Sequence, residues 1–150
     1  MNSKAAMAIV LAAGKGTRMK SDLPKVLIPV CGRPMIRYVC DALAGAGIAR
    51  IAIVVGHRAD LVREEFAGDD RVEFVEQTEQ LGTGHAVMMC RGQLTGHDGP
   101  VIVVTGDSPM LQQSSIAALL DVYESTHCAC ALGTVRTDDP QGWGRIVRDD

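Results

Sequence analysis

Two glycines and four basic side chains lie in residues 11–27, LAAGKGTRMKSDLPKVL. Gly14 and Gly16 allow the backbone to approach a ligand closely and to adopt a positive φ. Four cations accompany them: Lys15, Arg18, Lys20 and Lys25. The apolar residues 7–11 come directly before this loop, and ligands of open α/β sheets bind at the carboxyl ends of the strands. Cations beside a glycine turn at such an end predict a phosphate-binding loop.

The spacing of this loop differs from that of two common phosphate loops. A Walker A loop has the pattern G-x-x-x-x-G-K-S/T, whereas Gly14 and Gly16 are two residues apart and no Gly-Lys-Ser/Thr follows. The dinucleotide-binding pattern G-x-G-x-x-G fails at its third glycine, where Met19 stands. Taken alone, the glycines are equally compatible with an ordinary strand-to-helix turn surrounded by solvated lysines.

A carboxylate follows another apolar segment, residues 101–104, in the sequence TGDSP. Asp107 is therefore expected at the same edge of a sheet as the glycine loop. Mg²⁺ is typically held by one or two carboxylates together with substrate phosphates, so Asp107 is a candidate metal ligand. The alternative is that Asp107 caps the turn that Ser108 and Pro109 introduce.

A third group of candidates lies in QTEQLGTGHA, residues 77–86. This segment follows the apolar residues 72–75 and opens a helical pattern, so Gly82 and Thr83 would present free N–H groups at a helix N-terminus. The amide of Gln77 offers a donor and an acceptor together, as the imide edge of a base such as uracil requires. The Gly-Thr pair could also be a plain helix cap, and His85 is expected to be structural.

The composition is that of an ordinary globular domain: 150 residues, 47% apolar and 22% charged. A net charge of −3 argues against a general nucleic-acid or membrane-surface binder. No apolar run reaches the roughly 18 residues of a membrane span, and the N-terminus does not resemble a signal peptide. The five cysteines are odd in number and scattered, which predicts reduced core thiols in a cytoplasmic protein.

Apolar, β-branched segments alternate with segments of helical spacing. Strands are expected at residues 8–11, 51–55, 72–75, 101–104, 129–135 and 145–148. Helices are expected at residues 34–43, 59–66, 83–94 and 114–125. This alternation predicts an α/β fold, with a doubly wound, mostly parallel sheet and right-handed crossovers.

The motifs together resemble those of the sugar-1-phosphate nucleotidyltransferases, and most closely the bacterial N-acetylglucosamine-1-phosphate uridyltransferases. The resemblance runs from about Ala6 to Arg148 and includes a fourth motif, DPQGWGRIVR at residues 139–148. It implies a Rossmann-like sheet of the nucleotide-diphospho-sugar transferase type. It also implies that residues 1–150 are the N-terminal, nucleotide-binding portion of a uridyltransferase domain, truncated and without the acetyltransferase β-helix of the bifunctional members.

The implied reaction transfers UMP from UTP to N-acetyl-α-D-glucosamine 1-phosphate with Mg²⁺, giving pyrophosphate and UDP-N-acetylglucosamine for cell-wall synthesis. The resemblance makes Arg18 and Lys25 the catalytic cations and Asp107 the metal ligand. Gly142 would contact the sugar; Trp143 beside it stands where tyrosine is more usual. The implied nucleotide- and substrate-binding residues are Leu11, Ala12, Ala13, Gly14, Lys15, Gly16, Thr17, Lys25, Gln77, Gly82, Thr83, Thr105, Gly106 and Asp107.

Two alternatives stay open at this point. The family's second metal ligand is an asparagine further downstream than Asp150, so the chain could be a nucleotide-binding remnant with weak or no turnover. A nucleotidyltransferase for another sugar phosphate or for molybdopterin is the other alternative, against which QTEQLGTGHA argues. UTP and N-acetylglucosamine 1-phosphate are the expected partners, without nucleic acid or membrane, and the oligomeric state is open.

Overall fold

Four parallel strands form the central sheet of this protein, in the order β5-β4-β1-β6. The computed structural model describes residues 5–14, 16 and 21–148. The strands are β1 (Met7–Leu11), β4 (Arg50–Val55), β5 (Val72–Glu76) and β6 (Val101–Thr105). They lie at four of the six segments expected from the sequence. The α/β fold with a parallel sheet is therefore confirmed.

The position of the site follows from the two neighbours of strand β1 in the sheet. β4 lies on one side of β1 and β6 on the other, and the chain reaches them by moving in opposite directions across the sheet. Leu11, the last residue of β1, pairs with Val54 of β4 on one side and with Thr105 of β6 on the other. The chain moves outward from β1 to β4 and β5 and then returns to β6 on the far side. Such a reversal opens a crevice at the carboxyl ends of the strands, where ligands of open α/β sheets bind.

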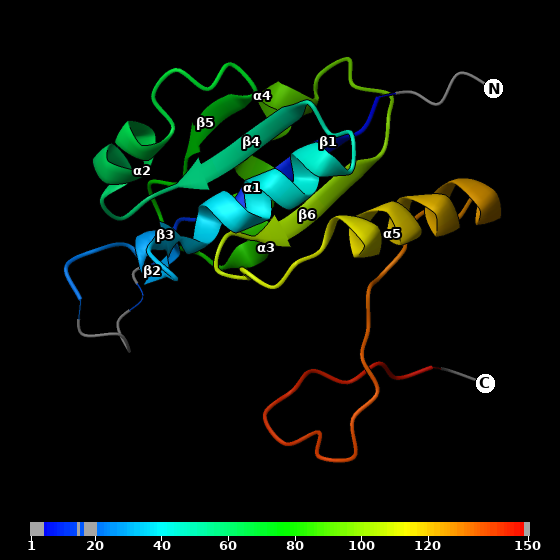
Figure 1. The fold of residues 1–150 in the computed structure, drawn as a ribbon. Helices are drawn as coiled ribbons and strands as arrows, with labels where there is room; N and C mark the ends of the chain where they lie inside the picture. The colour runs from blue at the N-terminus through cyan, green and yellow to red at the C-terminus, as the bar shows by residue number, and fades with distance from the viewer. Residues whose placement is uncertain (1–4, 15, 17–20, 149–150) are drawn as a thin grey trace.

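Helices cover both faces of the sheet (Figure 1), as a doubly wound fold requires. Ala8 and Val10 of β1 face a core that includes residues of α1, α2 and α5, whereas Met7 and Ile9 face residues of α3 and its continuation. Because alternate residues of a strand point to opposite faces, burial on both sides makes β1 apolar throughout. The helices are α1 (Met35–Gly45), α2 (Ala59–Glu65), α3 (Thr83–Met89), α4 (Arg91–Leu94) and α5 (Gln113–Thr126).

The second half of the glycine loop lies between β1 and α1. The loop ends in one turn of 3₁₀ helix, η2 (Lys25–Leu27), in which Val26 and Leu27 are buried, and a small hairpin follows. The hairpin strands are β2 (Pro29–Val30) and β3 (Arg33–Pro34), and Cys31 and Gly32 turn between them with positive φ. Burial of η2 against the sheet fixes the position at which Lys25 leaves the loop.

Two details of the expected secondary structure are wrong. The helix expected over residues 83–94 is divided into α3 and α4 at Cys90. Residues 129–135 and 145–148 form no strand in the described part of the chain. Residues 129–133 line a hollow beside β6 and α5 without pairing with β6, and the chain after them extends away from the sheet (Figure 1). A strand needs a partner for its backbone hydrogen bonds, and here the apolar side chains remain exposed, with Val135 at 71% and Val147 at 83%.

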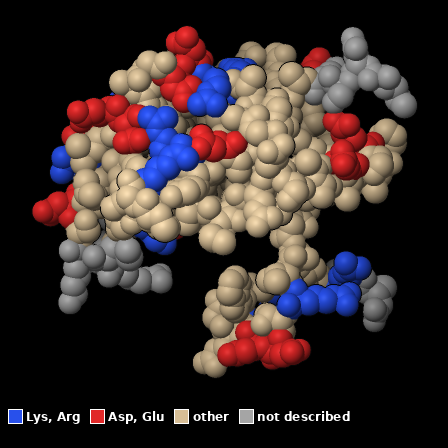
Figure 2. Space-filling model, in the orientation of Figure 1, with Lys and Arg blue, Asp and Glu red and all other residues tan. Residues whose placement is uncertain are grey.

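The surface in Figure 2 mixes both signs of charge, with basic and acidic side chains side by side near α2. Arg37 pairs with Glu65 there, and Arg71 pairs with Asp69. Among the described residues, no helix is long and apolar enough to cross a bilayer. All five cysteines are free thiols, but only Cys40 and Cys90 are buried, so the expectation of core thiols is wrong for the exposed Cys31 and Cys130.

Candidate functional site

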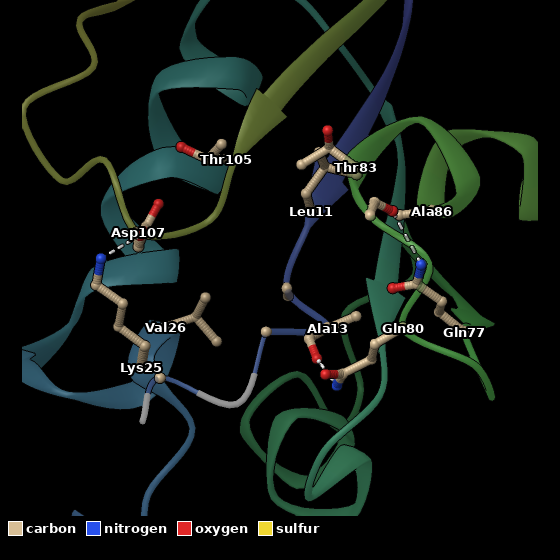
Figure 3. A pocket seen from close by; sticks show the side chains of 14 residues that line it. Leu11, Ala13, Lys25, Val26, Gln77, Gln80, Thr83, Ala86, Thr105 and Asp107 are labelled. Atoms are coloured by element: carbon tan, nitrogen blue, oxygen red, sulfur yellow. Dashed lines mark hydrogen bonds and ion pairs between the residues drawn. The ribbon is translucent and has the colours of Figure 1, made fainter. Parts of the chain in front are cut away.

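A cavity of about 390 Å³ opens at the carboxyl ends of β1 and β6, at the predicted crevice (Figure 3). Lys25 and Asp107 lie on one side of it, and Gln77 and Gln80 lie on the other. The lining residues are Leu11, Ala12, Ala13, Gly14, Gly16, Lys25, Val26, Gln77, Gln80, Gly82, Thr83, Ala86, Thr105 and Asp107. The cavity therefore combines all three candidate groups of the sequence in one site.

Backbone hydrogen bonds hold the floor of the cavity. The Ala12 amide donates to the Val54 carbonyl at 2.8 Å, and the Gly106 amide donates to the Leu11 carbonyl at 2.9 Å. A Cβ on Gly106 would lie 3.2 Å from that same carbonyl oxygen, so this position favours glycine. The loops after β1 and β6 are thus fastened to the sheet where a ligand would contact them.

Gly16 is required by both its conformation and its neighbour. Its φ is +59°, in the region that favours glycine, and an added Cβ would lie 2.9 Å from Cβ of Lys25. Gly14, two residues earlier, has no positive φ, and no atom of the described residues lies within 4 Å of its Cβ position. Gly16 therefore allows the loop to close against Lys25, whereas Gly14 leaves open space at the cavity.

We expect Gly16→Ala to destabilise the protein, because the left-handed conformation costs a residue with a Cβ about 1–2 kcal/mol. The temperature of thermal unfolding should fall by several degrees. Gly14→Ala is the matched control on the same loop and should unfold at the wild-type temperature. Equal unfolding temperatures for the two variants would contradict the requirement for glycine at position 16.

A short ion pair joins the two charged groups of the cavity. Lys25 Nζ lies 2.6 Å from Asp107 Oδ2, although 82 residues separate them along the chain. The lysine side chain is 43% exposed and the aspartate side chain 29% exposed, so ligands in the cavity can reach both. Thr105 Oγ1 lies 2.8 Å from Ser108 Oγ beside them, which closes the turn that carries Asp107.

Asp107 is held in its ionised form. Its partial burial alone would raise the pKa of the carboxyl, but hydrogen bonds from Lys25 and Thr105 and the positive charge of Lys25 outweigh that effect. The net result is a pKa below the ordinary value. The cavity thus contains an anionic oxygen at neutral pH, the kind of ligand that Mg²⁺ prefers.

The far end of the cavity is formed by the amide of Gln77, which is 5% exposed. Its Nε2 donates to the Gly82 carbonyl at 3.1 Å and lies 3.0 Å from His85 Nδ1. Its own backbone amide donates to the Val55 carbonyl at 2.8 Å, which anchors the residue just beyond β5. Gln77 is therefore a fixed group and not a mobile surface side chain.

Gln80 lies inside the candidate segment 77–86 and lines the cavity, although no individual role was predicted for it. Its Nε2 donates to the Ala13 carbonyl at 2.7 Å and so ties the segment before α3 to the glycine loop. Val26 and Ala86 also line the cavity and were not selected. The sequence signal for Gln80 is that it is a polar residue inside QTEQLGTGHA. Its partner is the backbone carbonyl of Ala13, 67 residues away along the chain, and the residue type at position 13 does not reveal this contact.

The structure brings together most of the predicted site residues. Gly106 does not line the cavity but lies against its lining residues Leu11 and Val26, and Asp107 forms the charged end of the cavity with Lys25. Lys15, Thr17, Arg18 and Lys20 lie outside the described residues, so the roles predicted for them stay predictions. Gly142 is exposed in the segment after α5 and does not line the cavity; its contact with the sugar is also still a prediction.

Only one carboxylate among the described lining residues is available to a metal ion. No group of three or more His, Cys, Asp or Glu side chains in the described part of the chain could hold one. Asp107 nevertheless fits Mg²⁺, because this ion commonly uses one or two carboxylates and completes its coordination with phosphate oxygens and water.

Proteins with a similar sequence include two bacterial proteins named "Bifunctional protein GlmU". The one from Listeria monocytogenes serotype 4a is 47% identical over 143 residues, which cover 95% of this chain and 31% of that protein. The one from Geobacter metallireducens is 47% identical over 141 residues, covering 94% of this chain and 30% of that protein. The chain thus spans about a third of the length of these curated relatives.

Solved structures with a similar fold include a nucleotidyl transferase from Methanothermobacter, with a TM-score of 0.66 at 25% identity; the match covers 78% of this chain and 57% of that one. UDP-glucose pyrophosphorylase from Acinetobacter gives a TM-score of 0.67 at 23% identity, covering 82% of this chain and 54% of that one. At such identity the second match shows the fold alone.

Residues 8–144 match the family described as the MobA-like NTP transferase domain. The chain belongs to this nucleotidyltransferase family, as its motifs predicted.

Proposed function

We propose that this chain binds UTP in the cavity and takes part in the transfer of UMP to N-acetyl-α-D-glucosamine 1-phosphate. The observation that carries the proposal is the arrangement of the cavity: a cation and a carboxylate lie at one side, and a fixed amide lies at the other. A nucleotide has the same polarity, with phosphates at one end and a base at the other. The GlmU relatives and the uridyltransferase motifs support this choice of nucleotide and sugar.

In the proposed reaction a phosphate oxygen of the sugar 1-phosphate attacks the α-phosphorus of UTP, and pyrophosphate leaves in line. The nucleophile is already an anion, so no general base is required. The chain must align two anions and stabilise the charge that spreads over the equatorial oxygens. Lys25 can stabilise that charge directly, while Gly14 and Gly16 allow phosphates to approach the loop backbone.

The ion pair between Lys25 and Asp107 has a consequence for substrate binding. Each group neutralises the other when the cavity holds no nucleotide. Asp107 would hold Mg²⁺, which supplies positive charge to the phosphate oxygens when it is bound. Lys25 would then exchange its carboxylate partner for phosphate, so both groups act on the nucleotide without leaving a buried charge unpaired.

A second candidate function is nucleotide binding without turnover. It is favoured by the single carboxylate among the described lining residues and by the position of Gly142 outside the cavity. The assay that separates the two functions is pyrophosphate release by the purified chain with UTP, N-acetylglucosamine 1-phosphate and Mg²⁺.

We expect pyrophosphate release that requires both substrates, and we expect UTP to bind more tightly than GTP or CTP. Release without the sugar phosphate would contradict the proposed transfer. UTP binding without release would favour the second candidate, and a preference for GTP would contradict the uridine assignment.

A further inference from the structure

Both amide hydrogens of Gln77 are already used inside the protein. The Gly82 carbonyl accepts one at 3.1 Å, and His85 Nδ1 accepts the other at 3.0 Å. A carbonyl oxygen can only accept, so the nitrogen of the Gln77 amide must face Gly82 and its oxygen must face the other way. The orientation of this amide is therefore determined by its partners.

His85 completes this arrangement. Because the amide nitrogen of Gln77 only donates, His85 Nδ1 must be unprotonated and act as the acceptor, with the ring hydrogen on Nε2. His85 lies on the first turn of α3, and Gly82 is the residue just before that helix. The short segment from Gly82 to His85 thus accepts both hydrogen bonds of the Gln77 amide nitrogen.

The carbonyl oxygen of Gln77 is the group left for a ligand. It points toward the cavity (Figure 3), and the hydrogen bonds of the Gln77 side chain with the described residues involve its nitrogen and not its oxygen. An oxygen acceptor of this kind selects a base edge that carries an N–H donor. Uracil has a donor at N3, whereas cytosine has an acceptor at N3 and would face the Gln77 oxygen with a second acceptor.

We propose that His85 is a positioning residue for base selection: it locks Gln77 so that only an acceptor is offered to the base, which favours uracil over cytosine. This inference rests on the proposed function, because it assumes that the base lies at the Gln77 end of the cavity. Without the acceptor on residue 85, the Gly82 carbonyl alone would hold the amide nitrogen, so the amide would rotate more easily and offer its nitrogen to cytosine. Substitution of His85 would therefore reduce the discrimination between uracil and cytosine but not the affinity for the phosphates.

The test compares the dissociation constants of UTP and CTP for the full chain and three variants by isothermal titration calorimetry. His85→Leu removes the acceptor at similar volume. His85→Asn keeps an acceptor oxygen near the position of Nδ1. His97→Leu is the matched control, because His97 is also partly buried but contacts the Pro100 carbonyl outside the cavity.

We expect the wild-type chain to prefer UTP over CTP by about tenfold or more, the effect of one mismatched hydrogen bond at a buried group. His85→Leu should lower the ratio severalfold, because only the Gly82 carbonyl then holds the amide nitrogen, while His85→Asn and His97→Leu should keep it. Thermal unfolding of each variant shows that the fold is retained.

A ratio that stays at the wild-type value in His85→Leu would overturn the positioning role and leave the proposed function intact. The same holds if His85→Asn loses the preference as fully as His85→Leu does. Equal binding of UTP and CTP by the wild-type chain would instead contradict the uridine assignment, and the inference with it.

Discussion

Asp107→Asn is expected to lower magnesium-dependent turnover by roughly a thousandfold, because one fixed charge at the reacting phosphates contributes on the order of 4 kcal/mol to transition-state stabilisation. The substitution keeps the shape of the side chain and its ability to hydrogen-bond with Lys25 and Thr105. It removes the negative charge that would hold Mg²⁺. The magnesium-dependent part of the UTP affinity should therefore be lost together with turnover.

The matched control is Glu73→Gln, which neutralises the acidic partner of another ion pair. Arg50 Nε lies 2.9 Å from Glu73 Oε1, and the two side chains are 48% and 35% exposed, close to the values for Lys25 and Asp107. Arg50 and Glu73 lie near the amino ends of β4 and β5, at the edge of the sheet opposite the cavity. Steady-state pyrophosphate release and titration of UTP with and without Mg²⁺ are the measurements. Wild-type magnesium dependence in Asp107→Asn would contradict the metal role.

Neither substitution should unfold the protein. A partly exposed ion pair contributes roughly 0–1 kcal/mol to stability, because both charges are also well solvated when they are apart. The unfolding temperatures of Asp107→Asn and Glu73→Gln should therefore stay close to that of the wild-type chain. This separation of stability from activity is what distinguishes a group that acts on substrate from one that supports the fold.

The central sheet could be predicted because its strands are buried on both faces. β1 and β4 are continuous apolar runs, and few alternatives to a central parallel strand exist for such segments. Residues 129–135 are also mostly apolar but form no strand. Whether an apolar segment becomes a strand depends on a neighbour that can pair with it, and local sequence contains no information about that neighbour.

The candidate site was predictable in its parts and not in its contacts. Each group follows a buried strand, so the edge of the sheet at which it lies follows from the parallel topology. The pairing of Lys25 with Asp107 depends on β1 and β6 being neighbours, which the order of strands along the chain does not reveal. The two hydrogen bonds from the Gln77 nitrogen to Gly82 and His85 depend on the side-chain rotamer of Gln77 and on the residue at which α3 begins. These details decide which group is left for the ligand.

Lys25→Met is expected to reduce turnover about as strongly as Asp107→Asn, by roughly a thousandfold. Methionine keeps much of the aliphatic stem that packs beside Gly16 and removes only the charge at the phosphates. The effect on Mg²⁺ should have the opposite sign. Asp107 loses the cation that competes with the metal ion, so the apparent affinity for Mg²⁺ should be retained or increased in Lys25→Met, whereas Asp107→Asn should lose it.

The two substitutions therefore distinguish a shared site from two independent charges. If Lys25 and Asp107 act on the same phosphates, the double variant Lys25→Met/Asp107→Asn should be little worse than either single variant, since groups that act as one unit are not additive. Arg50→Met is the matched control for the lost cation and should leave turnover and the Mg²⁺ titration unchanged. Wild-type turnover in Lys25→Met would contradict the role of Lys25. Fully multiplicative losses in the double variant would show that the ion pair does not reflect a common function, because each charge would then stabilise a different step or a different group.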